Sequence, residues 1–231
     1  MKDKLNSIDS IGAAIGRTAG VQEELKAEGV YRFELRRVLP SFKAQAEYLA
    51  RSIKRGRNAA WWKFWAKWDI AKLEQKLINL PRYTVFDELV PNTVTTPGKN
   101  DLLDKYLAGS AYTAAFFLGL ISLTSFSAIS AADTMASHAG WLEAGLANTP
   151  TYSNATRISA AWSSASAGSK ALSAALGFLI TGTGTVKGGF LTTVSTKDGT
   201  TGILFSAGLF TGGDKAVANT DTLNVSYSLA V

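Results

Sequence analysis

The chain has 231 residues, of which 46% are hydrophobic, and a formal net charge of +6. This length allows one large or two small domains with a substantial core. The sequence has no cysteine and a single histidine, His138, which excludes disulfides, thiolate nucleophiles, zinc ribbons and the commoner histidine-based metal clusters. The first residues lack the apolar run of a secretion signal, so we expect synthesis in the cytoplasm.

The positive charge is confined to the first half of the chain. Residues 1–105 hold 19 Lys and Arg against 13 Asp and Glu, whereas residues 106–231 hold five of each kind. The first half is rich in Glu, Lys, Arg, Leu and Trp, and the second in Ser, Thr, Gly and Ala. This change of composition predicts a helical, basic, Trp-rich anchoring region over residues 1–90 and a β-domain over residues 91–231.

The first region is expected to be mainly helical, with breaks at Gly29, Pro40, Gly56 and Pro81. One helix is expected from Ser41, a residue that favours the N-cap position, to Gly56. Its apolar stripe has helical spacing and consists of Phe42, Ala46, Leu49 and Ile53. A second helix is expected from about residue 58 to residue 79, where Pro81 stops it.

The sharpest local feature is the aromatic run of residues 61–68, which contains four tryptophans and one phenylalanine. Basic residues surround it, since residues 51–76 hold eight Lys or Arg against two acids. Three interpretations remain open: a protein packing or assembly interface, insertion at a membrane surface, and nucleic-acid binding through stacking and phosphate contacts. The partner-binding candidates are Phe42, Leu49, Ile53, Trp61, Trp62, Phe64, Trp65, Trp68, Arg51, Lys54, Arg55 and Arg57.

Residues 106–132 carry no charge, and these 27 positions are enough to cross a bilayer as a helix. The run contains many Ser, Thr and Gly residues, however, and no cluster of basic residues flanks its far end. Only residues 112–123 are strongly apolar, and there both faces of a pleat are apolar, which is typical of a buried strand. We therefore expect a strand, with a transmembrane helix as the alternative.

The rest of the chain shows the alternation of short antiparallel strands. Residues 172–180, 186–194 and 203–210 alternate in this way, and Asp198-Gly199 is a strong hairpin turn signal. In the final segment, residues 221–231, one face carries Leu223, Val225, Tyr227, Leu229 and Val231. Together with the helical first region, these strands predict an α+β protein whose C-terminal domain is an antiparallel, jelly-roll-like β-sandwich.

Four parts of the sequence carry a resemblance to a known family. They are the stretch DELVPNTVTTPGKNDLLD at residues 87–104, FFLGLI at 116–121, AADTMASHAGW at 131–141, and the ending with GLF at 208–210 and DTLNVSY at 221–227. Over about residues 87–231 the chain resembles a C-terminal β-domain of tailed-bacteriophage structural proteins. The resemblance implies a virion protein on the particle exterior, in the tail or the head.

The residue sets in the sequence that resemble catalytic arrangements do not meet the requirements of a catalytic site. Asp133, Ser137 and His138 are close in sequence, but a triad needs a base aimed at the nucleophile and oriented by the acid. The glycine-rich residues 182–189 lack the Gly-Lys-Ser/Thr ending of a phosphate-binding loop. Three carboxylate pairs are better explained as solvated surface than as a glycosidase site: Glu23 with Glu24, Asp87 with Glu88, and Asp101 with Asp104. We expect no enzyme activity and no catalytic, cofactor-binding or metal site.

The resulting hypothesis is a non-enzymatic component of a tailed-phage particle. Its helical N-terminal region would dock onto other virion proteins, and its β-domain would be packed or displayed. A tail-attached adaptor or short fibre base is favoured, with capsid decoration or a head fibre as the alternative. Because phage appendages are symmetric assemblies, we expect a homo-oligomer, with a trimer favoured. A membrane-active protein and a nucleic-acid-binding protein are the rivals from other classes.

Overall fold

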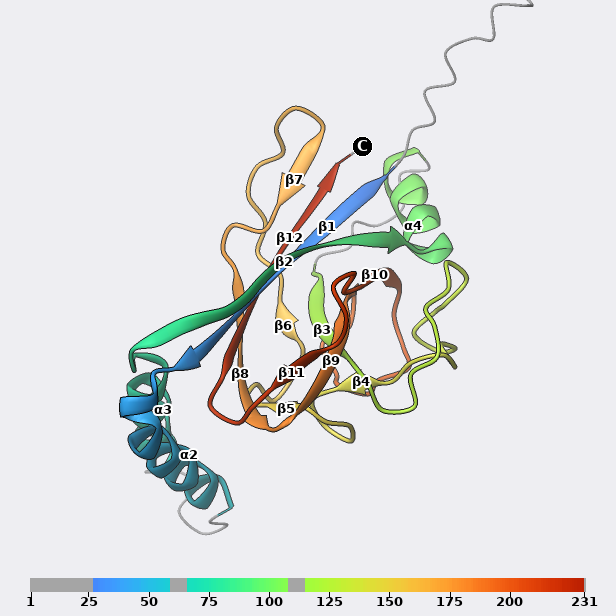
Figure 1. The fold of residues 1–231 in the computed structure, drawn as a ribbon. Coiled ribbons are helices and arrows are strands. Elements are labelled where there is room, and N and C mark those ends of the chain that lie inside the picture. The colour runs from blue at the N-terminus through green and yellow to red at the C-terminus, as the bar shows by residue number, and fades with distance from the viewer. Residues whose placement is uncertain (1–26, 59–65, 108–114, 231) are drawn as a thin grey trace, which may run out of the picture.

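The computed structural model describes residues 27–58, 66–107 and 115–230. Among their regular elements antiparallel strands predominate, and three α-helices are interspersed among these strands (Figure 1). In chain order the elements are β1 (Glu28–Val38), a 3-10 turn (Pro40–Phe42), α2 (Lys43–Asn58), α3 (Ala66–Ile78), β2 (Arg82–Val94), α4 (Thr96–Leu107), β3 (Phe117–Ser122), β4 (Glu143–Ala144), β5 (Thr151–Tyr152), β6 (Ile158–Ser159), β7 (Ser169–Ala171), β8 (Leu176–Gly182), β9 (Gly184–Thr192), β10 (Leu204–Leu209), β11 (Lys215–Val217) and β12 (Thr222–Ala230).

Nine of these strands form a continuous hydrogen-bonded path, in the order β4-β3-β9-β10-β2-β1-β12-β8-β5. Its two ends, β4 and β5, are joined along the chain by residues 145–150, so the sheet curls into a nearly closed antiparallel barrel. The expected α+β arrangement, with helices followed by a β-sandwich, is therefore wrong. A sandwich would need two separate sheets facing each other, whereas here one sheet bends around one core.

The core inside the barrel receives side chains from nearly every strand. Phe33 of β1, Leu118 of β3, Phe178 of β8, Leu191 of β9 and Val225 of β12 all belong to this single cluster and have essentially no exposed surface. Burial of such side chains contributes about 1.5–3 kcal/mol each relative to their exposure. The shared interior makes the strands mutually dependent for stability.

The first described strand corrects the expectation of a mainly helical N-terminal region. Tyr31, Phe33 and Leu35 alternate with Arg32 and Glu34, and all three apolar side chains are fully buried. This period of two belongs to a strand whose one face is covered. Strand β1 pairs with β12 from the other end of the chain and with β2, so it lies inside the main sheet.

The two expected helices are present with different bounds. Helix α2 continues past Gly56 to Asn58 instead of ending there. A Cβ atom on Gly56 would lie 3.0 Å from Ile70 of α3, so this glycine permits a close helix crossing. Helix α3 ends at Ile78, before Pro81 as expected. The pair is inserted between β1 and β2, and lies at the opposite end of these strands from α4 (Figure 1).

The strands expected in the second half are largely confirmed. Strand β12 carries buried Leu223, Val225 and Tyr227 on one face, as the alternation indicates. Strands β9 and β10 are antiparallel neighbours, and Asp198 lies in the turn region between them with φ of 55°. Strand β3 confirms a buried strand over residues 117–122. Within the described ranges, no helix has both the length and the apolar character needed to span a membrane.

The segment between β3 and β4 covers the outer face of part of the barrel. Its Met135 and Trp141 pack with Ile121, Phe190 and Leu204 of β3, β9 and the start of β10, and all five are at most 1% exposed. The barrel therefore has one core inside and a second, smaller one outside. This cover explains why strand β3 is apolar on both faces.

Candidate functional site

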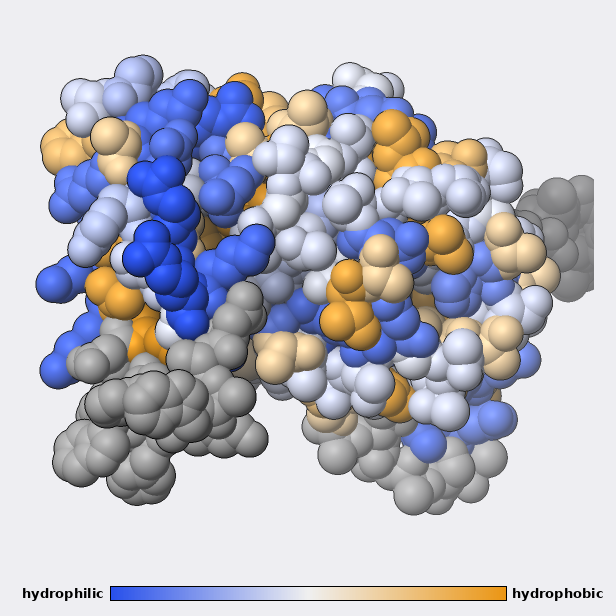
Figure 2. All heavy atoms as spheres, turned by 90° about the horizontal axis from the view of Figure 1, so that it is seen from below, coloured by the Kyte–Doolittle hydropathy of each residue, from blue (hydrophilic) through white to orange (hydrophobic). Residues whose placement is uncertain are grey.

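The basic surface of α2 is the sequence-predicted feature that remains exposed. Arg51, Lys54 and Arg55 are exposed, and none of them forms a hydrogen bond or an ion pair with another described residue. Figure 2 shows strongly hydrophilic side chains gathered over the helical pair, beside the paler surface of the barrel. These three cationic side chains, which are unpaired among the described residues, are available to an external partner.

Arg57 differs from its neighbours because the fold uses it. Its guanidinium forms an ion pair with Glu74 of α3 and donates a hydrogen bond to the carbonyl oxygen of Ser153, at 3.0 Å. Arg57 thus ties α2 to α3 and to the barrel just after β5. It orients the helical pair, while Arg51, Lys54 and Arg55 supply the free charge.

The apolar partner-binding candidates of α2 and of the turn before it pack against other parts of the same chain. Leu49 and Ile53 are each 5% exposed and pack against Leu77 of α3 and Leu179 of β8. Phe42 is partly buried against the same cluster. The helical stripe that the sequence indicates is real, but it joins the helices to each other and to the barrel and does not face outward.

The structure describes only part of the aromatic run of residues 61–68. Trp61, Trp62, Phe64 and Trp65 lie outside the described residues. The backbone of Trp68 belongs to the first turn of α3, and its side chain also lies outside the description. The interpretation of this run as an interface therefore stays a prediction.

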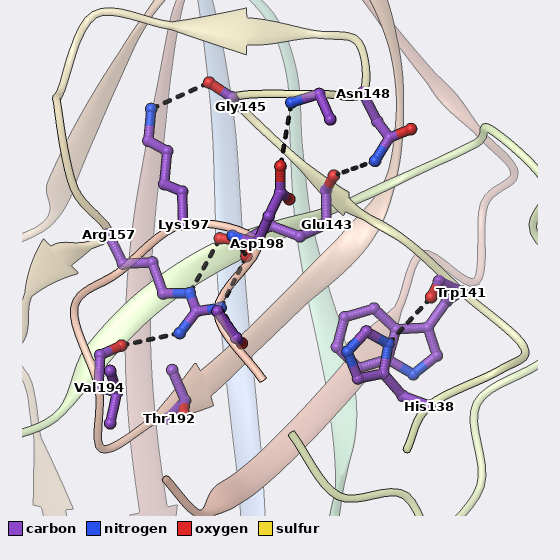
Figure 3. A network of polar contacts seen from close by, with 12 residues as sticks. His138, Trp141, Glu143, Gly145, Asn148, Arg157, Thr192, Val194, Lys197 and Asp198 are labelled. Atoms are coloured by element: carbon purple, nitrogen blue, oxygen red, sulfur yellow. Dashed lines mark hydrogen bonds and ion pairs between the residues drawn. The ribbon is translucent and has the colours of Figure 1, made fainter. Parts of the chain in front are cut away.

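A buried ion pair that sequence reasoning missed joins Glu143 of β4 to Arg157, the residue before β6. Arg157 and Glu143 form two hydrogen bonds, from Nε to Oε1 at 2.9 Å and from Nη2 to Oε2 at 2.7 Å (Figure 3). Their side chains are 0% and 3% exposed. Arg157 also donates to the carbonyl oxygens of Val194 and Gly199, and Glu143 accepts from the backbone N–H of Asp198. Each nitrogen and oxygen atom of the two side chains has at least one partner, so the pair ties β4 to the segment before β6 and to the loop between β9 and β10.

Lys197 extends this network. Its ammonium donates to the carbonyl oxygens of Gly145 and Tyr152 and lies 3.5 Å from the centre of the Tyr152 ring. Burial lowers the pKa of Lys197 to about 8 and raises that of the Tyr152 hydroxyl. A lysine with a lowered pKa is a common nucleophile or base. Lys197 is only 7% exposed, however, and its hydrogen bonds brace the loop between β4 and β5.

The candidate triad residues take structural roles. Asp133 accepts a hydrogen bond from the indole N–H of Trp141 at 3.0 Å, and the His138 ring stacks on Trp141 with its Nδ1 3.0 Å from the Trp141 carbonyl oxygen (Figure 3). Ser137 is bonded through its backbone to Thr134. These contacts hold the segment that covers the outer face of the barrel.

The other sequence candidates are also placed by the fold. Asp87 pairs with Arg32 on the outer face of the sheet, and Glu88 accepts from the backbone of Thr211 and Gly212 and pairs with Lys215. The glycines of residues 182–189 belong to β8, β9 and the link between them. Glu23 and Glu24 lie outside the described residues. In the described part of the chain, no three His, Asp or Glu side chains gather as metal ligands.

The sequence gives only a weak indication of the network around Glu143, Arg157 and Lys197. The second half of the chain holds five basic and five acidic residues, and isolated charges in a largely uncharged domain are candidates for pairing. Arg157 lies 14 residues from Glu143, and Asp198, whose backbone N–H also bonds to Glu143, lies 55 residues from it. Spacing alone therefore does not identify these partners.

Comparison with known proteins adds no family to this geometry. No protein-family model matches the chain, and no curated protein matches it in sequence.

Proposed function

We propose that this chain is a non-enzymatic structural component of a tailed-phage particle, attached through its helical pair. The observation that carries the proposal is the position of α2 and α3. They are inserted between two central strands, held to the barrel by Leu179 and Arg57, and leave Arg51 and Lys54 unpaired among the described residues. A rigidly mounted, basic projection is suited to docking, because little conformational freedom is lost on binding.

The resemblance over residues 87–231 supports the same proposal. Those residues form most of the barrel, so the part of the chain that resembles phage exterior domains is the part that would be packed or displayed. We favour a tail-attached adaptor or short fibre base, in trimeric form, over capsid decoration. Nucleic-acid binding remains the second candidate because unpaired arginine and lysine side chains also suit phosphates.

Particle composition tests the proposal directly. In particles purified from infected cells, we expect the chain to copurify at a constant ratio to the major capsid protein. A particle reconstruction should then place α2 and α3 against the particle and the barrel away from it, at the tail for an adaptor and on the shell for decoration. Absence of the chain from purified particles would refute the proposal.

A further inference from the structure

A cleft of about 400 Å³ lies between the helical pair and the barrel. Its apolar part is formed by Ile53 and Leu77 from the helices and by Leu179 from β8. Its polar part combines cations of α2 with the hydroxyl and amide side chains of the barrel, namely Thr151, Ser153, Thr181 and Asn219. This volume falls within the range of about 300–1,000 Å³ that is typical of ligand pockets.

The charge of the cleft is unbalanced. Among the described residues that line it, three side chains are cationic and one, that of Glu74, is a carboxylate. Glu74 is already neutralised by Arg57, which leaves Arg51 and Lys54 without a counter-charge among the described residues. Apart from the paired Arg57 and Glu74, the described residues around Arg51 and Lys54 in the cleft are uncharged. The cleft therefore attracts anions.

The cleft is also preformed. Arg57 connects both helices to the carbonyl oxygen of Ser153, and Ser153 in turn donates its backbone N–H to the carbonyl oxygen of Leu179. Opposite walls are thus tied by hydrogen bonds, and the buried cluster of Leu49, Ile53 and Leu77 supports the helical side. A ligand entering such a cleft does not have to order it first.

We propose that this cleft receives an acidic peptide segment of a neighbouring protein. Two carboxylates would bind Arg51 and Lys54, because the guanidinium of Arg51 binds a carboxylate in a bidentate manner and the ammonium of Lys54 pairs with one as a point charge. An apolar side chain between them would cover Ile53 and Leu179. This inference rests on the proposed function and adds the chemistry of the docking partner.

A nucleic acid fits the cleft less well. None of the described residues that line it is aromatic, whereas sites for single strands use aromatic rings as stacking platforms. Two unpaired cations would also release few counterions from a phosphate backbone, and counterion release supplies most of the affinity. The apolar floor favours a peptide, which alternates charged and apolar side chains.

Fluorescence anisotropy of labelled probes on the full chain tests this inference. The probe is a fluorescein-labelled peptide of alternating glutamate and leucine, and the matched peptide carries glutamine in place of glutamate. We expect the glutamate peptide alone to bind, with affinity that falls as salt screens the charges. Arg51→Glu with Lys54→Glu should weaken binding about tenfold or more, because it removes two charge-assisted hydrogen bonds and places anions opposite the carboxylates of the peptide.

The matched control is Lys72→Glu with Lys76→Glu, which changes the net charge equally on exposed residues of α3 outside the cleft. It should leave affinity within about twofold, as expected for screened, distant charges. Should the charge reversal disturb folding by circular dichroism, Arg51→Gln with Lys54→Gln replaces it and should weaken binding in the same direction.

Three results would overturn the inference: no binding of the glutamate peptide, equal loss in the cleft and control variants, or preferential binding of labelled oligothymidylate. The proposed function is judged separately by the presence of the chain in particles. A chain that copurifies with particles but does not bind the glutamate peptide would refute the cleft as a peptide receptor and leave the structural role standing.

Discussion

Arg157 and Glu143 show how a single residue pair can organise loops that are far apart in sequence. Both charges are withdrawn from water, and the cost is offset only because each polar atom finds a partner. The Arg157 guanidinium also lies 5.3 Å from the centre of the Phe190 ring. Such a pair specifies one loop arrangement, since any other would leave a buried charge unpaired.

Replacing Arg157→Met should destabilise the protein by about 3–5 kcal/mol, because it leaves Glu143 buried without a partner. The measurement is the free energy of unfolding in urea. The double variant with Glu143→Met should recover part of the loss, since it removes both charges. Arg32→Met, which breaks the exposed pair with Asp87, should leave stability unchanged within error. A small effect of Arg157→Met would contradict the assigned role.

Lys197 should make stability rise with pH between about pH 8 and 10. Its pKa is lowered to about 8 by burial, although the charges of Glu143 and Asp198 act against this shift. In the unfolded chain its pKa is near 10.5, so the unfolded state binds more protons in this window and the free energy of unfolding increases with pH. The total gain is at most about 3 kcal/mol, at about 1.36 kcal/mol per pKa unit.

Above about pH 10 the tyrosines reverse the trend. Burial raises the pKa of Tyr31, Tyr152 and Tyr227, so the unfolded chain loses these protons first and stability falls as pH rises. Urea unfolding at a series of pH values measures both effects. Lys197→Met should abolish the rise below pH 10, whereas Lys170→Met on the partly exposed strand β7 should keep it. A rise that persists without Lys197 would assign it to another group.

At the scale of elements, glycines set how closely strands and helices approach. Strand β9 is central to the barrel because it pairs with β3, β10 and β11. At Gly188 an added Cβ would collide with the carbonyl oxygen of Gly208 in β10. At Gly177 in β8 the nearest atom would be the Asn224 side-chain oxygen at 3.5 Å, an ordinary contact. Gly188 therefore permits the close approach of β9 to β10, whereas the position of Gly177 has room for a Cβ atom.

Gly188→Ala should destabilise the protein by about 1–3 kcal/mol or more, since backbone atoms would have to shift. Gly177→Ala should be neutral or stabilise slightly, because alanine restricts the unfolded chain more than glycine does. Thermal unfolding followed by circular dichroism compares the two. Equal effects of both substitutions would show that the close approach of β9 and β10 is not limiting.

The whole molecule brings the two ends of the described chain together. Glu28 of β1 lies opposite Ala230 of β12, and β2 continues from residue 82 to residue 94 without a break. The helical pair shares its buried cluster with Val38 of β1 and Leu179 of β8. Contacts of this kind couple the helices to the barrel and favour unfolding as one unit.

Calorimetry should therefore show a single unfolding transition, with calorimetric and van't Hoff enthalpies that agree. Leu77→Ala should lower the whole transition, because it removes about 2–5 kcal/mol from the shared cluster. Tryptophan fluorescence, to which the buried Trp141 contributes, and far-ultraviolet circular dichroism should report the same midpoint. A separate early transition of the helices would show that α2 and α3 unfold independently of the barrel.

Local pattern by itself determined several parts of this protein. The alternation of Leu223, Val225 and Tyr227 indicated β12, and the spacing of Leu49 and Ile53 indicated α2. These signals are local because the period of a side-chain pattern depends only on the backbone conformation of its own segment. The basic face of α2 was visible for the same reason, since its charges are neighbours in sequence.

Only the tertiary structure decided how these elements combine. It made residues 28–38 a strand, closed the sheet into a barrel, carried α2 past Gly56 and paired Arg157 with Glu143. Each of these outcomes depends on partners distant in sequence, as when the Tyr31 hydroxyl bonds to the side chain of Ser206. Period and composition show which face of a segment is buried, but long-range packing selects the neighbour that buries it.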